Sequence, residues 1–597
     1  MKQTAEWRQL APDLYLFPDA CNVYLLRDED RALVVDFGSG AWHSRLEEIG
    51  VKQIDHVVLT HAHRDQLYGL YRSSDHPYTI HAPAGDGSLL RPPDLAHFWK
   101  EYQANGCPTC YAAPRLPLDD VRLDLAGDTE TLVGPARFCA IATPGHTPGA
   151  LTYLVEWRGR HLAFCGDATH SGGKLHQLYH LEWDHWTPSG CLAAWHGLER
   201  LSYCHFDLLL PSHGPIVDHR PRTCVRQVQK RLLDLISAKG SVCAGAKSTW
   251  LDLERLACGA RRILPHLYHF GSNSFLLASD SGEGLVVDPQ LADIDQLPIL
   301  LQEIGPLRIT AGIASHYHMD HSDGLDFIRR EYGARIWLHP WVAEPIVDRN
   351  RLDVPWLPTE SIVPDRILPE NGPFRWCEYR FASHAFPGQT RWHTAFDTHA
   401  DGRHVLFSGD NYQPPTRWNG TGGFCSFNGS RFRDGFAHSA RTVLDIAPEI
   451  ICNGHGCIYR FASSQYRRIL RWTKKAEKAV GSLCPSPQWL ADYDCRAARW
   501  EPFVTQTKPG RKIKLSFVYQ NHFEEAVALL ISPAVPPGWQ TTPANRRVRI
   551  PAGKQRRAKF TFQIPQKAEK GRHLIAADLL IGDQLIGEAC VAIVDIV

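Results

Sequence analysis

The sequence has no long uncharged apolar run. No stretch approaches the ~18–20 residues that a helix needs to cross a bilayer, so we expect no membrane partner. It also has no excess of charge, because 65 Lys and Arg against 64 Asp and Glu leave a net charge of +1. Without a large positive field, a dedicated nucleic-acid-binding function is disfavoured. Residues 1–6 lack the apolar segment of a signal peptide, which favours a cytoplasmic protein.

The 17 cysteines follow no short, regular framework of the kind that marks a disulfide-rich domain. We therefore expect free thiols, as in a cytosolic protein. One pair, Cys107 and Cys110, has the CxxC spacing, and no second CxxC accompanies it. We interpret this pair as incidental thiols; the alternative is a redox pair or an accessory metal site.

What the chain does have is length and an internal repeat. Its 597 residues exceed what one hydrophobic core supports, and its 44% hydrophobic and 22% charged content is that of an ordinary globular protein. Five local patterns occur twice in the same order, at offsets between 242 and 255 residues, which indicates a duplicated domain. The paired landmarks are Asp36 and Asp288, His61 and His316, Pro144 and Pro387, Asp167 and Asp410, and His213 and His455.

Each copy contains strand signals followed by a helix signal. Apolar, β-rich runs such as 33–36, 56–60 and 161–165 end on or directly before the motif residues. Helices are expected over 224–238 and 466–480, after the last histidine of each copy. Strands that deliver polar side chains at their ends, with helices between them, predict a layered α/β fold whose site lies at one rim of the sheets.

The segment after residue 495 differs from the two copies. It contains short apolar runs separated by Pro and Gly turns, without helical periodicity, which predicts an antiparallel β-sandwich. Its turns at 535–539 and 551–554 resemble those of immunoglobulin-like accessory domains appended to bacterial hydrolases. It has no cluster of metal-ligand residues, so we expect a packing or binding role. The predicted domains are 1–245, 255–483 and 495–597.

The most informative stretch is 316–321, His-Tyr-His-Met-Asp-His, which places four metal-binding side chains within six residues. In a loop at the end of a strand these side chains converge on a divalent cation, and zinc is the usual occupant of such a set. The first copy repeats the pattern at 61–66 as His-Ala-His-Arg-Asp-Gln, with Gln66 in place of the last histidine.

Both copies resemble the metallo-β-lactamase fold superfamily, over residues 8–480. The resemblance implies an α/β fold class: two αβ/βα sandwich domains of four layers each, followed by the antiparallel β-sandwich. Gln66 stands where the superfamily has a histidine, so we expect the second metal site of the first copy to be weaker or empty. The implied ligands in this copy are His61, His63 and His146 for the first site, and Asp65, Asp167 and His213 for the second, with Asp167 bridging.

In the second copy Gln389 occupies the slot that His146 has in the first. His393 follows four residues later, and a rearranged loop would let it serve as the third histidine. We favour His393 over Gln389 or a water in that position. With this choice, we expect the second copy to hold the better two-metal site. Its implied ligands are His316 and His318 for the first site, and Asp320, His321 and His455 for the second, with Asp410 bridging.

The residues and the resemblance together predict a metal-dependent hydrolase that uses a metal-bound hydroxide on a small ester, thioester, lactone or phosphoester-type substrate. Asp65 and Asp320 are the predicted catalytic residues, since each is placed to bind a metal or to orient the nucleophile. The expected cofactor is Zn²⁺, one or two ions per site, with iron or manganese as alternatives. Aromatic and Arg-rich loops after each bridging Asp suit an anionic group on the substrate, and they equally suit packing at the rim.

Two other functions fit parts of the pattern. The superfamily includes mononuclear iron oxygenases that act on small thiols and persulfides, and these need only three protein ligands. A non-catalytic duplicated scaffold is the other alternative, because each copy has one ligand replaced by glutamine. The two copies could also pack as an internal pseudo-dimer.

Overall fold

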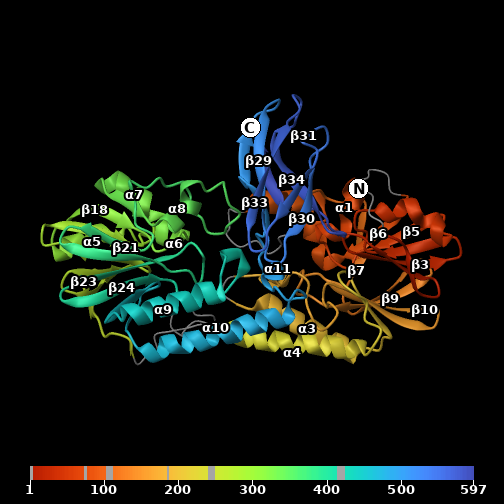
Figure 1. Ribbon diagram of the computed structural model, residues 1–597, viewed down its shortest axis with the longest axis horizontal. Helices are drawn as coiled ribbons and strands as arrows, with labels where there is room; N and C mark the ends of the chain where they lie inside the picture. The colour runs from red at the N-terminus through yellow and green to blue at the C-terminus, as the bar shows by residue number, and fades with distance from the viewer. Residues whose placement is uncertain (1–4, 73–76, 103–111, 185–186, 240–248, 413–423) are drawn as a thin grey trace.

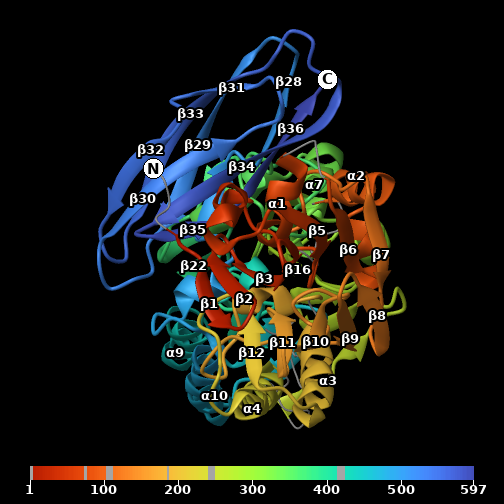
Figure 2. The same ribbon diagram turned by 90° about the vertical axis from the view of Figure 1, so that its right-hand side faces the viewer.

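The computed structural model describes residues 5–72, 77–102, 112–184, 187–239, 249–412 and 424–597, so the Cys107 and Cys110 pair lies outside the described residues. Two α/β domains lie side by side, and a β-sandwich stands against them (Figure 1; Figure 2). The fourteen cysteines of the described part are free thiols. No helix in this part is both long and apolar enough to cross a membrane.

The first repeat consists of two sheets packed face to face, with helices on their outer faces. The first sheet has seven strands in chain order, antiparallel from β1 to β4 and parallel from β4 to β7. These strands are β1 Arg8–Ala11, β2 Leu14–Pro18, β3 Asn22–Asp28, β4 Arg31–Val35, β5 Gln53–Val58, β6 Thr79–Pro83 and β7 Val121–Leu125. The second sheet, in the order β12-β11-β10-β9-β8, consists of β8 Thr129–Val133, β9 Ala136–Ala142, β10 Leu151–Trp157, β11 Arg160–Gly166 and β12 Leu208–Pro211.

Helices flank these sheets on the outside. Residues of α1 (Arg64–Arg72) and α2 (Pro92–Glu101) pack in one core with the first sheet, and those of α3 (Ser189–Tyr203) and α4 (Pro221–Lys239) pack in another with the second. Three shorter helical segments are η1 Ala41–Ile49, η2 Ala84–Leu89 and η3 Leu178–Leu181.

The second repeat has the same plan with eight and six strands. Its first sheet contains β13 Glu254–Arg255, β14 Arg261–Leu264, β15 Leu267–Phe270, β16 Ser274–Ala278, β17 Glu283–Val287, β18 Arg308–Ile313, β19 Arg335–Leu338 and β20 Arg366–Ile367. Its second sheet contains β21 Gly372–Trp376, β22 Tyr379–Ala385, β23 Thr394–Ala400, β24 Arg403–Gly409, β25 Ile450–Asn453 and β26 Cys457–Arg460. The helices are α5 Gln296–Ile304, α6 Met319–Ser322, α7 Gly324–Tyr332, α8 Pro340–Val347, α9 Ala437–Ile446, α10 Ser463–Leu483 and α11 Leu490–Tyr493, with short turns η5 Ser426–Asn428 and η6 Phe432–Phe436.

The apolar strands explain why the sheets are covered on both faces. Side chains alternate across a strand, so a strand buried on both faces must be apolar at every position. In β4, Leu33 and Val35 belong to the core between the two sheets, while Ala32 and Val34 belong to the core under the helices. The predicted layered α/β fold is confirmed.

The two repeats meet along their last long helices, α4 and α10, which run along one side of the molecule (Figure 1). These helices share one hydrophobic core. The indole Nε1 of Trp472 donates a hydrogen bond of 2.8 Å to the carbonyl of Ala238, and the backbone N–H of Leu175 donates one of 2.8 Å to the carbonyl of Leu483. The predicted helices over 224–238 and 466–480 are both present and extend slightly further at each end.

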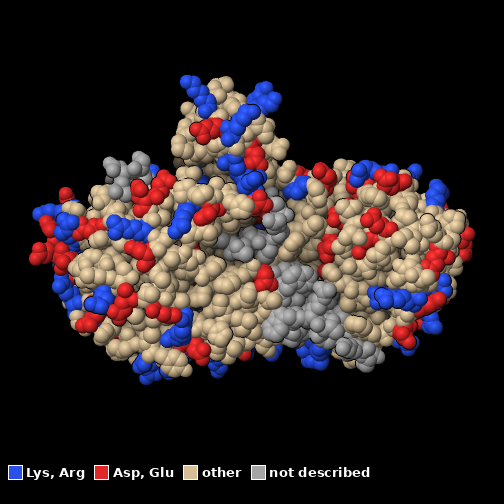
Figure 3. All heavy atoms as spheres, turned by 180° about the vertical axis from the view of Figure 1, so that it is seen from behind, with Lys and Arg blue, Asp and Glu red and all other residues tan. Residues whose placement is uncertain are grey.

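The C-terminal domain is a two-sheet sandwich, as predicted. One sheet contains β27 Ala498–Glu501, β29 Lys512–Gln520, β33 Gln555–Gln563 and β31 Gln540–Thr542. The other contains β28 Val504–Thr507, β36 Val591–Ile596, β34 Gly571–Ile581, β30 Val527–Ala534 and β32 Arg546–Ile550, with β35 Gln584–Ile586 paired to β34. The strands pair antiparallel except β28 with β36. Acidic and basic side chains are interspersed over the face of the molecule in Figure 3, which agrees with the near-zero net charge.

The sandwich is anchored to the first repeat by a buried ion cluster. Glu588 is fully buried, and its Oε1 lies 2.8 Å from Nη2 of Arg72 and 3.0 Å from Nη2 of Arg115. The hydroxyl of Tyr71 donates to the other carboxylate oxygen. This domain therefore docks through specific polar contacts as well as apolar packing.

Candidate metal centres in the two repeats

The motif residues of the first repeat lie in the segments that follow β4, β5, β9, β11 and β12, all at one rim of the two sheets. Asp36, directly after β4, ties these loops together. Its carboxylate accepts hydrogen bonds from the backbone N–H of Thr60, at 2.9 Å, and from the hydroxyl of Ser212, at 2.7 Å. Burial raises the pKa of Asp36 to about 7, against the effect of these hydrogen bonds. The loops that carry His61 and His213 are thereby held beside each other.

Three histidines of the first repeat, His61, His63 and His146, form one compact group. Each is buried, and one ring nitrogen from each lies within 4.8 Å of the others. Nε2 of His61, Nε2 of His63 and Nδ1 of His146 have no hydrogen-bond partner in the described part of the chain. Buried polar atoms normally have partners, so this set fits a divalent metal ion. Burial lowers the pKa of His61 to about 4 and that of His63 well below 6.5, which keeps these rings neutral, as a metal requires.

A second group lies next to the first and contains Asp65, His176 and His213, again with ligand atoms within 4.8 Å of one another. Oδ2 of Asp65 lies 3.3 Å from Nε2 of His213. Asp167 touches both groups: its Oδ2 is 3.3 Å from Nε2 of His146, and its Oδ1 is 2.9 Å from Nδ1 of His213. Burial would raise the pKa of Asp167, but His213 and His146 outweigh it and hold the pKa well below its usual value. Asp167 therefore lies between the two groups, and its role as a bridging ligand stays a prediction.

Sequence reasoning missed His176. This residue lies between β11 and η3, outside the repeated motifs, and His180 follows four residues later within η3. The ring of His180 lies 4.2 Å from that of His63 and 4.6 Å from that of His146, centroid to centroid. Two histidines four residues apart, between the bridging Asp and the last His, were the available signal. The aromatic side chains of the same segment masked it.

Gln66 belongs to neither group. Its side chain is fully buried, and neither its amide oxygen nor its amide nitrogen has a hydrogen-bond partner among the described residues. Its backbone carbonyl accepts hydrogen bonds from the N–H groups of Phe37 and Gly38, at 2.8 and 3.0 Å. His176 is thus a further candidate ligand in the second group of the first repeat, the site that we expected to be weaker or empty.

Among the described residues of the second repeat, Asp320, His321, Asp410 and His455 form one group. Nε2 of His321 is 3.2 Å from Oδ1 of Asp410, and Nε2 of His455 is 3.2 Å from its Oδ2. Nδ1 of His321 lies 3.1 Å from Oδ2 of Asp288, the counterpart of Asp36, which orients the ring. These four residues were all predicted as ligands.

The predicted first site of the second repeat is arranged differently. The rings of His316 and His393 are stacked, with centroids 4.7 Å apart, and Nε2 of His316 lies 3.1 Å from Nδ1 of His318. Among the described residues, these three histidines do not form a group with all ligand atoms within 4.8 Å. The backbone N–H of Asp410 points to Nε2 of His393 at 3.3 Å, and the amide of Gln389 donates to Oδ2 of Asp410 at 3.1 Å. Whether His393 or Gln389 binds a metal stays a prediction.

Comparison with known proteins agrees with this fold. Residues 16–197 and 267–455 each match the family model of the metallo-beta-lactamase superfamily, and residues 507–581 match that of the NPCBM-associated NEW3 domain of alpha-galactosidase. The two segments cover more than half of the chain, which therefore belongs to the metallo-beta-lactamase superfamily, with the domain repeated twice and followed by a NEW3 β-sandwich.

Individual relatives are distant. The probable metallo-hydrolase YqgX of Bacillus subtilis (strain 168) is 27% identical over 174 residues, which are 28% of this chain and 73% of that protein. A HARLDQ-motif mutant of a metallo-beta-lactamase from Cronobacter sakazakii is 18% identical, with a TM-score of 0.30 over 39% of this chain and 98% of that one. A metallo-beta-lactamase family protein from Thermus thermophilus is 20% identical, with a TM-score of 0.30 over 39% of this chain and 84% of that one.

Proposed function

We propose that the protein is a metal-dependent hydrolase whose working centre, a two-metal site, lies in the first repeat. The observation that carries this proposal is the adjacency of two complete ligand groups that share contacts with Asp167. The sequence favoured the second repeat, because its motif at 316–321 keeps the last histidine that Gln66 replaces in the first repeat. The grouping of ligand atoms supports the first repeat instead. Among the described residues, only the first repeat has a group of three histidines next to a second group that contains an aspartate.

Metal ions held by these groups, with zinc the favoured ion, would acidify a bound water and stabilise the negative charge that develops on the substrate. The side chains of the chain itself have separate tasks. His61, His63 and His146 would hold one ion, and Asp65, His176 and His213 the other. Asp167 holds the two groups next to each other through its contacts with His146 and His213.

Asp65 has a second task, because it also lines a pocket beside the centre. Its carboxylate is placed to orient the attacking water toward a substrate in that pocket. In the reaction, the oxygen of water forms a bond to the acyl carbon or phosphorus. The bond to the leaving group breaks, and a proton passes to that group. The supported substrates are small esters, thioesters, lactones or phosphoesters.

The test uses the full-length protein loaded with zinc and two matched double variants, His61→Ala/His63→Ala and His316→Ala/His318→Ala. Metal content is measured by elemental analysis, and hydrolysis is measured with para-nitrophenyl acetate and bis-para-nitrophenyl phosphate. We expect the first double variant to lose metal and to lower hydrolysis by at least about a hundredfold, since the loss of metal ligands costs more than the loss of their supporting contacts. The second double variant should retain most of the activity.

Activity that survives the first double variant and disappears with the second would move the working centre to the second repeat. Hydrolysis that is unchanged in both variants and after removal of metal by a chelator would contradict the metallo-hydrolase proposal. Iron in place of zinc in the purified protein would favour the oxygenase alternative.

A further inference from the structure

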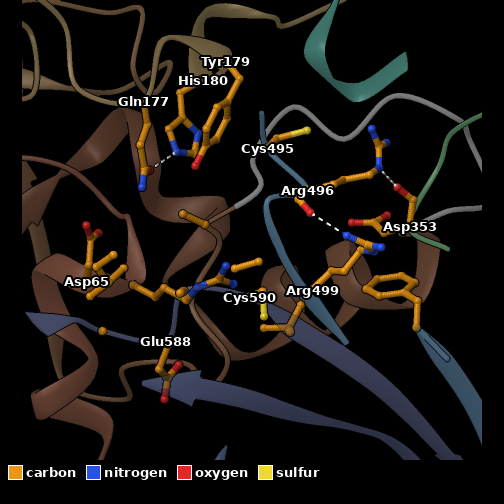
Figure 4. A pocket seen from close by; sticks show the side chains of 18 of the residues that line it. Asp65, Gln177, Tyr179, His180, Asp353, Cys495, Arg496, Arg499, Glu588 and Cys590 are labelled. Carbon is orange, nitrogen blue, oxygen red and sulfur yellow. Dashed lines mark hydrogen bonds between the residues drawn. The ribbon is translucent and has the colours of Figure 1, made fainter. Parts of the chain in front are cut away.

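Two cavities border the second ligand group of the first repeat. Figure 4 shows the pocket beside Asp65, whose walls include Tyr179 and His180 of the first repeat and Glu588 of the sandwich. The other cavity has His213 in its lining, and Asp65 and His213 belong to one ligand group, with Oδ2 and Nε2 3.3 Å apart. Each cavity therefore reaches the proposed metal centre through a ligand.

The cavity at His213 lies between the first repeat and the C-terminal sandwich. The turn between β2 and β3 supplies one part of its lining, and the hairpin of β34 and β35 supplies another. Its free space, part of it open to solvent, is about 1320 Å³. This hairpin cavity is large enough for an organic ligand, and it exists only because the sandwich is docked on the first repeat.

The hairpin presents two leucines to the cavity. Leu580 and Leu585 face each other across the two strands, and both line the cavity. Side chains alternate across a strand, so Leu579, Ile581 and Ile586 point the opposite way, into the core of the sandwich. Among the described residues, Leu580 and Leu585 belong to no hydrophobic core, although both are half-buried. They offer apolar surface that a ligand could remove from water.

The position of the hairpin is set by the residues that follow it. At Gly587 there is no room for a β-carbon, which would meet the ring of Tyr68 in α1. The next residue, Glu588, is paired with Arg72 at the end of the same helix. Because α1 also carries Asp65, the hairpin and this ligand are held by one element.

The wall that the first repeat supplies makes little demand for polar partners. It contains Pro18 and Ala20, and its polar side chains are already hydrogen-bonded within the chain. Nδ2 of Asn22 donates to two backbone carbonyls, at 2.9 and 2.8 Å. The carboxylate of Asp19 accepts from the backbone N–H of Ser39 at 3.0 Å and from its hydroxyl at 2.8 Å. A ligand here does not have to satisfy these groups.

The charges of the lining do not favour an anion. Arg8 and Asp583 are exposed and opposite in charge, and Asp19 adds a second carboxylate. Apart from the metal ligand His213, the described lining thus has no excess of positive charge. The part of a ligand that best matches this cavity is uncharged and apolar.

The chemistry assigns the two cavities to the two halves of a substrate. The leaving group takes up a proton, so it belongs beside Asp65, the residue proposed to orient the water. The acyl half then extends from the centre past His213, toward Leu580 and Leu585.

We propose that the hairpin cavity binds the apolar acyl chain of the substrate, and that Leu580 and Leu585 are specificity-determining residues for its length. The substrate class is accordingly an uncharged acyl ester, thioester or lactone with a chain of several carbon atoms. This inference rests on the proposed function for the identity of the reaction, whereas binding of an apolar chain stands independently of it.

The test uses the zinc-loaded full-length protein and the para-nitrophenyl esters of acetate, butyrate and hexanoate, which differ only in the acyl chain. The value of kcat/KM is measured for each ester. Binding of acetate and hexanoate is measured by calorimetry. Metal content and the midpoint of thermal unfolding are measured for every variant.

We expect kcat/KM of the wild type to rise about fourfold for each methylene that the cavity buries, and hexanoate to bind more tightly than acetate. The variant Leu580→Ala/Leu585→Ala should reduce the rise to less than about twofold per methylene, because it removes the surface that the chain contacts. The matched control Leu132→Ala/Leu233→Ala truncates two exposed leucines of the first repeat and should keep the full rise.

A second variant fills the cavity instead of opening it. Leu585→Trp should lower kcat/KM for the hexanoate ester at least about tenfold and leave that for the acetate ester within about twofold, since only the longer chain meets the added ring. Its metal content should equal that of the wild type.

A chain-length dependence that survives both Leu580→Ala/Leu585→Ala and Leu585→Trp would overturn the inference. A lower unfolding midpoint with unchanged chain-length dependence would assign the two leucines to domain packing and overturn it too. Selective binding of hexanoate without hydrolysis of any ester would support the cavity and count against the proposed function. Hydrolysis of all three esters with equal kcat/KM would support the function and overturn the assignment of the cavity.

Discussion

The imidazole of His176 lies flat against that of His213, with ring centroids 3.8 Å apart and planes inclined by 12°. Both rings belong with Asp65 to one ligand group. His213 is a motif residue, whereas His176 is in no repeated pattern. This pair bears on the substitution at Gln66, because His176 offers an imidazole to the group in which the motif lacks its last histidine.

The first prediction concerns this replacement. The His176→Ala variant should lose about one of the two metal ions proposed for the first repeat, because the second group then keeps only one imidazole and binds zinc less tightly. Elemental analysis after exhaustive dialysis measures the loss. Gln66→Ala is the matched control, and its metal content should equal that of the wild type. Loss of metal from Gln66→Ala, with His176→Ala unaffected, would restore the amide as the ligand.

The second prediction concerns the glutamine of the second repeat. The amide of Gln389 points to Asp410, at the place that corresponds to His146. Gln389→His should therefore increase metal content by about one ion per chain, because imidazole is the better zinc ligand. The His393→Ala variant separates the alternatives: a drop in metal content would identify His393 as a ligand, as the sequence suggested, and an unchanged content would exclude it.

The third prediction concerns the anchoring of the sandwich. Burial would raise the pKa of Glu588, but Arg115 and Arg72 outweigh it and hold the pKa below the usual 4.5. A depressed pKa means that the ion cluster stabilises the fold above about pH 4.5 and that this contribution is lost as the pH falls through the folded-state pKa. Glu588→Gln should lower the free energy of unfolding by about 3–5 kcal/mol at neutral pH, because it leaves the buried guanidinium of Arg115 without its carboxylate, whereas Arg72 keeps Asp578.

Denaturant unfolding at several pH values tests this prediction. The stability difference between wild type and Glu588→Gln should shrink as the solution is acidified below pH 4.5. Glu130→Gln removes an exposed carboxylate paired with Arg137 and should change stability by no more than about 1 kcal/mol. A Glu588→Gln protein as stable as the wild type would show that the sandwich docks through apolar contacts alone.

The fourth prediction concerns metal removal. His61 and His63 each bury a ring nitrogen without a partner in the described part of the chain, so a bound ion should stabilise the folded state. Raising free zinc to about a hundred times its dissociation constant should add about 2.7 kcal/mol per site. Thermal unfolding at increasing free zinc should show a rising midpoint, and the rise should be smaller in His61→Ala/His63→Ala. A midpoint that does not respond to zinc in the wild type would contradict a metal site here.

The sequence by itself determined the duplication, the class of fold and most of the candidate ligands that the structure brings together. His61, Asp167 and His213 recur as His316, Asp410 and His455 at nearly constant offsets, and each follows an apolar strand. Strand ends in such sheets lie at one rim, so order along the chain was enough to predict which side chains meet. The sandwich was predictable for a similar reason, because its alternating strands and turns are local signals.

Only the tertiary structure decided what completes the site. His176 reaches Asp65 through the path of the segment after β11, and no periodic pattern encodes that path. The pocket depends on the docking of the sandwich, in which Tyr71 and Glu588, 517 residues apart in the chain, come into contact. Such contacts depend on how the sandwich packs against the first repeat. That packing is determined by the shapes of the two folded surfaces, to which residues far apart in the sequence contribute. Most candidate ligands can therefore be predicted from local sequence patterns, whereas the walls that enclose the site form only when the domains of the chain pack together.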